Sequence, residues 1–322
     1  MSGMWFLPLF ALLVSWFVLK LLLHRASMLP LDHPNERSLH QHPTPRIGGL
    51  GIMAGLTICS LLLRPDDVFV LAVFAVGLSA LSLLDDFRGL SVRVRFAGHV
   101  LAAAMTVYAL PEMPVWANWL AVLAMVWMTN LYNFMDGSDG LAGGMSLFGF
   151  ACYGAAAWLG GAEAFALLAW IIAAAATGFL MFNFPPARVF MGDAGSIPLG
   201  YLAAALGLAG WATDIWPIAF PLLVFSPFIV DASVTLARRS LRGEKIWQAH
   251  RSHYYQRLVL MGWSHRRLAL FEYGVMAAAA ISGLVLLQYP LMQSLILLVW
   301  CLFYFALAVV IDRRWKESGL AY

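Results

Sequence analysis

Long apolar stretches recur along the whole of this 322-residue chain, and they constrain its fold more than any other feature. Hydrophobic residues make up 62% of the sequence and charged residues only 11%, with a mean hydropathy of +0.79. A soluble globular domain carries about 25% charged residues, which cover its surface. This chain lacks those charges. The composition therefore predicts an integral membrane protein and excludes a disordered chain, a collagen-like repeat and a secreted disulfide scaffold.

The apolar stretches divide the chain into eleven expected spans, because a helix needs roughly 20 apolar residues to cross a bilayer. Proline and glycine in the short connections mark the helix ends. We expect an all-α, polytopic membrane helical bundle that forms a single transmembrane domain over residues 1–322. The expected spans are 5–23, 47–63, 68–84, 96–110, 115–132, 142–159, 163–181, 196–211, 216–232, 268–287 and 291–311.

The first span and the distribution of Lys and Arg predict the orientation. No basic residue precedes the first span and no cleavage site follows it, so we expect a retained helix with its N-terminus outside. One alternate set of connections, with the tail 312–322, contains every Lys and Arg except Lys20 and Arg64. This excess assigns that set, and the C-terminus, to the cytoplasm. The cytoplasmic connections are 24–46, 85–95, 133–141, 182–195 and 233–267.

The polar clusters with potential chemistry all fall on this cytoplasmic side. A site at the membrane boundary suits an enzyme that joins a soluble substrate to a lipid, because lipid head groups lie there. The alternative is a secondary transporter for a nucleotide sugar or a divalent cation, which needs carboxylates near mid-membrane. No Asp or Glu falls at the middle of an expected span, and Glu272 comes nearest to an exception. The sequence therefore favours the enzyme.

Several carboxylates in these connections have a spacing that suits metal or phosphate chemistry. Asp85-Asp86 ends an apolar helix, and such a pair alone is more typical of a solvated helix terminus. Asn133, Asp136 and Asp139 follow at intervals of three, so a helical turn would place them on one face. A glycine-rich turn that uses them as caps is the alternative.

Asp193 lies in a glycine-bracketed turn, where it could cap the next helix or bind a hard cation. With Asn133 it would form a sparse oxygen site. Mg²⁺ usually takes one or two protein oxygens together with substrate phosphates and water, so we expect Mg²⁺, with Mn²⁺ as the alternative. The guanidinium groups of Arg46, Arg95 and Arg251 would then complete a diphosphate site.

His250 and His253 lie in the longest cytoplasmic connection, in the stretch HRSHYYQRL. Zinc would need further ligands at a regular spacing that the sequence lacks, so phosphate or sugar binding fits the pair better. Two surface histidines in a basic loop are the alternative. The basic character of this loop follows from the positive-inside bias, so we expect no nucleic-acid binding. Each of the three cysteines sits in an apolar run and is expected to be buried.

Five segments occur in the order and on the side of the membrane that typify a known enzyme family. They are PTPRIGG, LLDDFRGLSVRVRF, NFMDGSDGLAGG, FNFPPARVFMGDAGS and HRSHYYQRL. In these segments, from Asp32 to about Leu258, the chain resembles the polyprenyl-phosphate N-acetylhexosamine-1-phosphate transferases of glycosyltransferase family 4. The resemblance implies transfer of a sugar-1-phosphate from a UDP-N-acetylhexosamine to undecaprenyl phosphate, with release of UMP, in the bacterial inner membrane.

The resemblance also implies roles for matching residues. The expected Mg²⁺ ligands are Asn133 and Asp193. The expected catalytic carboxylates are Asp85, Asp86 and Asp136. The lipid phosphate would meet Arg46 and Asp85. The residues expected to bind the nucleotide sugar are Arg95 at the diphosphate, Asp139 and Asn183 at the uracil, Phe190 stacked on it, and His250, Arg251 and His253 on the sugar and phosphate side.

One difference from another member of this family narrows the range of expected sugar donors. The peptidoglycan translocase of this family carries consecutive histidines where this chain has His250-Arg-Ser-His253. We therefore expect the branch that initiates surface polysaccharides such as O-antigen, with GlcNAc, FucNAc or QuiNAc as the sugar. The expected partners are the UDP-N-acetylhexosamine, undecaprenyl phosphate and membrane lipid, and a homodimer is left open.

Overall fold

The structure is a computed structural model that describes residues 3–25, 31–32, 34, 39, 43–63, 67–111, 114–245, 248 and 250–320. Most of the expected loop 24–46 thus lies outside the described residues. Within them, the regular structure is helical apart from two short antiparallel strands, β1 (Leu31–Asp32) and β2 (Thr44–Pro45).

Most of the expected spans correspond to helices of the structure. They are α1 (Leu7–Leu23), α2 (Gly48–Leu62), α3 (Asp67–Arg88), α4 (Val92–Ala109), α5 (Val115–Phe134), α6 (Leu141–Leu159), α7 (Glu163–Asn183), α8 (Asp193–Ala212), α9 (Ala219–Val224), α10 (Ser226–Leu241), α11 (Tyr254–Leu260), α12 (His265–Gln288), the 3-10 helix η2 (Pro290–Met292) and α13 (Gln293–Glu317).

Six segments of the described chain are long and apolar enough to cross a membrane. They are most of α3, the whole of α6, α7, α8 and α12, and the unit of η2 with α13; α1 and α2 are apolar but shorter. The expectation of an all-helical protein with several membrane spans is confirmed. The count of eleven spans and the sides of the termini stay predictions.

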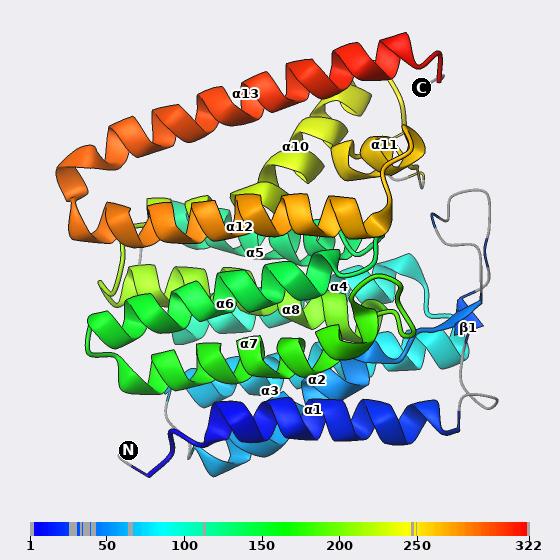
Figure 1. Ribbon diagram of the computed structural model, residues 1–322. Coiled ribbons are helices and arrows are strands. Elements are labelled where there is room, and N and C mark those ends of the chain that lie inside the picture. Colours follow the sequence, from blue (N-terminus) through cyan, green and yellow to red (C-terminus); the bar gives the residue numbers. More distant parts are fainter. Residues whose placement is uncertain are drawn as a thin grey trace.

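The expected span 216–232 is divided in the structure, so the prediction of one unbroken helix was wrong. Phe225 leaves the helical conformation between α9 and α10. Pro227 explains the break, because a proline ring collides with the helical carbonyl four residues earlier and fits only the first turn of a helix. After the break, α10 runs obliquely to its neighbours (Figure 1). The short helix α11 inside the connection 233–267 was also not predicted.

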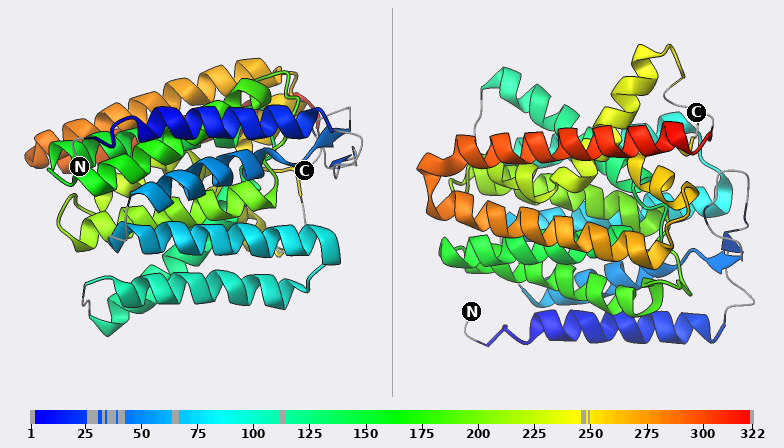
Figure 2. Two further views of the ribbon diagram at one scale, coloured as in Figure 1. Left: turned by 90° about the horizontal axis from the view of Figure 1, so that it is seen from below. Right: turned by 45° about the horizontal axis from the view of Figure 1, so that its top comes forward.

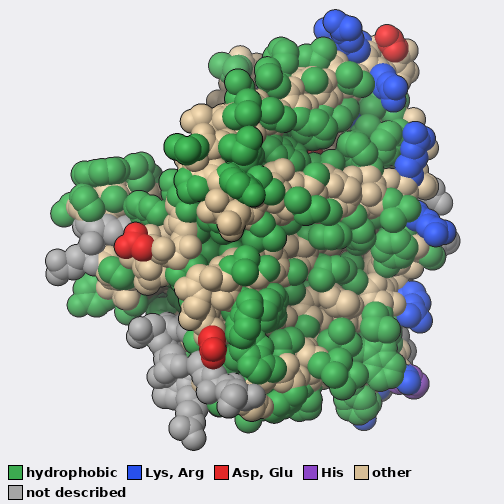
Figure 3. All heavy atoms as spheres, turned by 60° about the vertical axis from the view of Figure 1, so that its left-hand side comes forward, with side chains coloured by type: hydrophobic (Ala, Val, Ile, Leu, Met, Phe, Trp, Pro, Cys, Tyr) green, Lys and Arg blue, Asp and Glu red, His purple; other side chains and the backbone are tan. Residues whose placement is uncertain are grey.

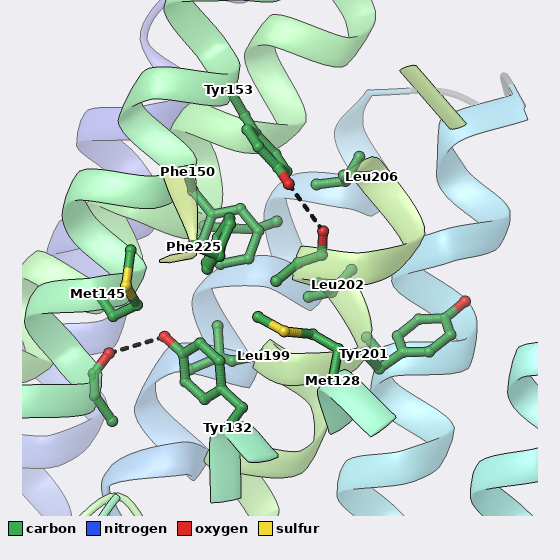
Figure 4. Close-up of a cluster of buried hydrophobic side chains, with 14 of the residues drawn as sticks. Met128, Tyr132, Met145, Phe150, Tyr153, Leu199, Tyr201, Leu202, Leu206 and Phe225 are labelled. Atoms are coloured by element: carbon green, nitrogen blue, oxygen red, sulfur yellow. Dashed lines mark hydrogen bonds between the residues drawn. The ribbon is translucent and has the colours of Figure 1, made fainter. Parts of the chain in front are cut away.

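The centre of the bundle lies between α5, α6 and α8, where the side chains in Figure 4 pack together. Tyr132 and Tyr153 are fully buried there. The Tyr132 hydroxyl donates to the Ala142 carbonyl at 2.9 Å, and the Tyr153 hydroxyl to the Ala203 carbonyl at 3.1 Å. An unpaired hydroxyl would be costly in this apolar setting, so these bonds fix the three helices in one register.

Helices α1 and α13 lie at opposite edges of the bundle (Figures 1 and 2). α13 buries only Ile311 and Trp315 and turns most of its apolar side chains outward. Cys301 is therefore exposed, and the expectation that it is buried was wrong, whereas Cys59 and Cys152 are buried.

Lys and Arg side chains line one edge of the molecule (Figure 3). We call this edge the basic end. α1, α3, α5 and α7 finish there, and α2, α6, α8 and α12 begin there. Because helix ends carry the polar loops, the basic end gathers residues from many parts of the chain.

Candidate active site

Three chain segments meet at the basic end, where α5 finishes and α8 begins. Asp193 is the first residue of α8, where the helix dipole stabilises a carboxylate. Its Oδ1 accepts hydrogen bonds from Asn133 Nδ2 at 3.0 Å and Arg46 Nη2 at 3.3 Å. Asn133 Nδ2 also donates to Ser196 Oγ at 2.9 Å. We call these four residues the Asp193 junction. It joins residues that the sequence placed in three separate connections.

Backbone hydrogen bonds hold the Asp193 junction together. The Phe190 amide donates to the Pro45 carbonyl at 2.8 Å. In return, the amides of Gly48 and Gly49 donate to the carbonyls of Phe190 and Met191, both at 2.8 Å. The segment that carries Arg46 is therefore fixed to the segment before Asp193 by main-chain atoms.

Two glycine positions allow this close approach. A Cβ on Gly195 would lie 2.7 Å from the Gly49 Cα, so α2 and α8 touch backbone to backbone. Gly192 has a φ of +71°, in the region that side chains disfavour. The glycine-bracketed turn is thus what aims Asp193 at Arg46 and Asn133.

Two further carboxylates lie close to the junction. Asp136 follows the end of α5 and accepts a hydrogen bond from the Gly192 amide. Burial, and next the charge of Asp193, raise the pKa of Asp136 well above its usual range, against the opposing charge of Arg46. Asp86, in the last turn of α3, is within electrostatic range of Arg46 and Asp193. Three carboxyl groups therefore surround one guanidinium, and the raised pKa favours the protonated form of Asp136.

This donor set fits a small oxygen-ligated cation. The hydrogen bonds use Oδ1 of Asp193 and Nδ2 of Asn133, so within the described part of the chain one oxygen of each side chain is left for a ligand. Among the described residues, no group of three or more His, Cys, Asp or Glu forms a metal-binding cluster. A cation here would take few protein ligands, as Mg²⁺ commonly does beside substrate phosphates.

Asp85 forms a separate pair with Arg95 across the turn between α3 and α4. Its Oδ2 accepts from Arg95 Nη1 at 2.8 Å, and its Oδ1 accepts from the Leu90 amide at 2.7 Å. Each carboxylate oxygen therefore accepts a hydrogen bond, and the group is held in one orientation.

Asp139 and Asn183 link the connections 133–141 and 182–195. Asn183 Oδ1 accepts from the Gly140 amide at 2.9 Å, and its Nδ2 donates to the Val189 carbonyl at 2.8 Å. Asp139 Oδ2 accepts from the Ala187 amide at 2.9 Å. Because α5 ends at Phe134, Asp139 does not share a helical face with Asn133, and that prediction was wrong. Phe190 is half-buried at the far end of this second connection.

His253 lies at the start of α11, buried against residues of two other helices. Its Nδ1 is 3.3 Å from Asp231 Oδ1 on α10. Its ring stacks with that of Phe134, the last residue of α5, at a centroid distance of 6.4 Å. Since Phe134 follows Asn133 directly, His253 is placed beside the end of α5 that carries the junction.

His250 and Arg251 differ in their surroundings. The His250 ring lies 4.9 Å from that of His253, and its Nδ1 is 2.9 Å from Ser252 Oγ. Burial, followed by the charges of His253 and Arg239, lowers the pKa of His250 to about 4. Arg251 is exposed.

Sequence reasoning missed two residues of this region, Asp231 and Ser196. Asp231 lies near the end of the expected span 216–232, and an acid inside an apolar span is a signal that it has a partner. Ser196 follows Asp193 by three residues, a spacing at which a hydroxyl on a first helical turn lies beside the first residue.

The fold and the site define a polytopic membrane protein with carboxylates, an amide and arginines gathered at one end, a composition suited to phosphate esters. A family model described as glycosyl transferase family 4 matches residues 68–210. The chain is 32% identical over 287 residues to the probable undecaprenyl-phosphate N-acetylglucosaminyl 1-phosphate transferase of Bacillus subtilis, which covers 83% of this chain and 80% of that protein.

Two further relatives show the same relationship. The undecaprenyl-phosphate alpha-N-acetylglucosaminyl 1-phosphate transferase of Escherichia coli is 28% identical, with 89% of this chain and 85% of that protein covered. The phospho-N-acetylmuramoyl-pentapeptide-transferase of Moorella thermoacetica is 31% identical, with 76% and 84% covered. The chain belongs to the polyprenyl-phosphate N-acetylhexosamine-1-phosphate transferase family and is a membrane-bound transferase.

Proposed function

We propose that this protein transfers an N-acetylhexosamine-1-phosphate from a UDP-sugar to undecaprenyl phosphate and releases UMP, with Mg²⁺ as the cofactor. The observation that carries the proposal is the Asp193 junction, in which a carboxylate and an amide with free oxygens lie beside Arg46. The names of the relatives point to the same transfer. We place the site on the cytoplasmic face of the bacterial inner membrane, because Lys and Arg line the basic end.

The proposed reaction is a single in-line displacement. A phosphomonoester has its second pKa near 6, so the lipid phosphate is largely dianionic at neutral pH and needs little help from a base. One of its oxygens attacks the β-phosphorus of the UDP-sugar. The bond from that phosphorus to the bridging oxygen breaks, and UMP leaves with the electron pair.

The main barrier is the approach of two anions, which positioning and electrostatics must lower. Asn133 and Asp193 would hold Mg²⁺, which when bound supplies positive charge to the diphosphate. Arg46 faces the same carboxylate and would meet the lipid phosphate. Arg95 would meet the diphosphate. Because hydrogen bonds to both oxygens hold Asp85 in one orientation, we assign Asp85 mainly to orienting the acceptor.

The remaining carboxylates and loops have supporting parts in this proposal. Asp86 and Asp136 lie beside the proposed cation site, where a bound cation would favour their ionised forms. Asp139 and Asn183 fasten the two connections that would surround the uracil, next to Phe190. His250, Arg251 and His253 would line the sugar and phosphate side.

An apolar cavity of about 130 Å³ supports a lipid acceptor. It is lined by side chains of α5, α6, α8, α9 and α10, among them Trp127, Leu131, Phe225 and Ile229. Leu131, one residue of this lining, precedes Asn133 by two residues on α5. A prenyl chain attached to a phosphate at the junction would find apolar contacts here.

We propose that the product initiates a lipid-linked surface polysaccharide such as O-antigen. The spacing of His250 and His253 supports a simple hexosamine donor. A panel of UDP-GlcNAc, UDP-FucNAc, UDP-QuiNAc and UDP-MurNAc-pentapeptide tests this choice, and turnover of the pentapeptide donor alone would contradict it.

The test of the reaction is UMP release by purified protein with undecaprenyl phosphate, Mg²⁺ and that panel. We expect release with one donor, dependent on both the lipid and the metal. Asp193→Asn should lose it, whereas Asp214→Asn should keep it. Asp214 is an exposed aspartate at the other end of α8 and is a matched control. Equal activity of the two variants would refute the proposed role of Asp193.

The stereochemistry at phosphorus tests the single displacement. With a chirally labelled β-phosphorus we expect inversion. Retention would indicate two displacements through a covalent enzyme intermediate and would contradict the mechanism proposed here.

A further inference from the structure

Asp231 on α10 collects four polar groups on one carboxylate. Its Oδ1 accepts hydrogen bonds from the Tyr254 amide at 2.9 Å and the Thr235 hydroxyl at 3.1 Å, and it lies 3.3 Å from His253 Nδ1. Its Oδ2 accepts from the Tyr255 amide at 3.0 Å. One side chain therefore joins α10 to the first turn of α11 and to the His253 ring.

These hydrogen bonds make it possible to bury the carboxylate of Asp231. The Asp231 side chain is 10% exposed and that of His253 is 3% exposed. A buried carboxylate is destabilising unless hydrogen bonds replace its water, and Asp231 has four such partners. In addition, α11 has only seven residues, too few to persist without tertiary contacts. The carboxylate at its first turn supplies such a contact.

The chain of contacts continues to the Asp193 junction. The His253 ring stacks on Phe134, and the Tyr255 hydroxyl donates to the Phe134 carbonyl at 3.1 Å. Phe134 directly follows Asn133. The position of α11, and with it the orientation of His253, is therefore tied to the end of α5 that presents a proposed metal ligand.

We propose that Asp231 is a positioning residue that orients the His253 ring for its contact with a phosphate of the nucleotide sugar. A carboxylate at Nδ1 fixes the ring plane and directs Nε2 away from α10, because the two nitrogens lie on opposite sides of the ring. This role rests on the proposed function for its catalytic consequence, but the orientation of His253 is a property of the protein alone.

The matched control is Asp312 on α13. Asp312 also braces α11, since it accepts a hydrogen bond from the buried Arg257 at 2.9 Å and pairs with Arg238. No contact between Asp312 and His253 is found among the described residues. A comparison of Asp231→Asn with Asp312→Asn therefore separates the orientation of His253 from the general support of α11.

The experiment uses the full chain in detergent, with three variants: Asp231→Asn, Asp231→Glu and Asp312→Asn. UMP release gives kcat and the KM for the donor. Nitrogen NMR of ¹⁵N-labelled histidine, assigned with His253→Gln, reports the His253 ring at a fixed pH. Hydrogen exchange reports the amides of Tyr254 and Tyr255.

We expect Asp231→Asn to lower kcat roughly 10–100-fold, the usual cost of removing an orienting partner, with little change in KM. The His253 ring signals should shift, and Asp231→Glu, which keeps the carboxylate, should restore part of both. Asp312→Asn should lower the thermal midpoint and leave kcat and the His253 signals near those of the wild type.

Two results would overturn the proposal. One is that both Asn variants lose activity only in proportion to their folded fraction. The other is that the His253 signals are unchanged in Asp231→Asn. If the wild type releases no UMP with any donor, the proposed function fails, and the ring signals with the Tyr254 and Tyr255 exchange rates still decide the positioning role.

Discussion

The Asp193 junction and the surroundings of His253 are two halves of one candidate site, and they are held together differently. At the junction, Arg46 and Asp193 are brought together by main-chain hydrogen bonds and by direct contact of two glycines. Around His253, the carboxylate of Asp231 fixes the first turn of α11, and the ring of Phe134 stacks on the histidine. The first half depends on backbone geometry, and the second depends on side-chain contacts, those of Asp231 above all.

This difference determines how each half responds to change. A backbone contact survives most substitutions nearby, but it fails when a glycine gains a side chain. A side-chain contact is lost with one substitution, and its loss leaves the fold intact. The junction should therefore lose function when its ligands or its glycines change, and α11 should be unaffected.

Removal of the metal gives the largest expected effect. Chelation by EDTA should abolish UMP release, by a factor on the order of 10²–10³ or more, because the charge on the diphosphate is then left without its strongest counter-charge. Added Mg²⁺ should restore the rate, and Mn²⁺ should restore part of it. Exchange of the Tyr254 and Tyr255 amides should stay the same throughout. Full activity after chelation would remove the metal from the mechanism.

Loss of the Asn133 amide should have the next largest effect. Asn133→Leu removes the bonds to Asp193 and Ser196 with little change in volume, so we expect kcat to fall roughly 10–100-fold and the Mg²⁺ requirement to rise. Asn130→Leu is the control. Its amide lies one turn earlier and donates to the Val126 carbonyl of its own helix. Equal losses in the two variants would show that the helix end, rather than the amide at the junction, matters.

The contact of α2 with α8 should be sensitive to one methyl group. Gly195→Ala places a Cβ against the Gly49 backbone, so we expect the free energy of unfolding to fall by about 1–3 kcal/mol, with activity falling too. The measurement is thermal unfolding in detergent. Gly274→Ala, at an α12 position with no atom within 4 Å of an added Cβ, should leave the midpoint unchanged. A stable, active Gly195→Ala would show that the close approach is dispensable.

His250 should give the smallest effect. Since its pKa is about 4, below the ordinary value of 6.5, the ring is neutral at physiological pH, and His250→Asn should not change the shape of the rate profile above about pH 6. As the pH falls, His250 is protonated at a higher pH in the unfolded chain than in the folded protein. The wild type should thus lose stability between about 6.5 and 4, and the variant should lose less. A new inflection near neutrality in the wild-type rate that the variant lacks would contradict this assignment.

The sequence predicted the residues of the Asp193 junction better than the residues that support the site around them. Asn133 and Asp193 stood out because polar residues in short glycine-rich connections have few structural alternatives in an apolar chain. The prediction of one helical face for Asn133, Asp136 and Asp139 failed, since it depended on where α5 ends. To predict the break at Phe225 from the sequence, the effect of Pro227 inside an apolar run has to be considered. Asp231 was missed because span assignment judged it by hydropathy, whereas its role follows from tertiary partners on α11.

The pairing of Pro45, Gly48 and Gly49 with Phe190 and Met191 also sets an order of events during synthesis. Arg46 and Asp193 are 147 residues apart along the chain. The ribosome therefore synthesises Arg46 long before Asp193. The segments that form α3 to α7 are made in between. A nascent chain that stops before α8 has helices for the membrane but no site, so this enzyme becomes competent only late in its own biosynthesis.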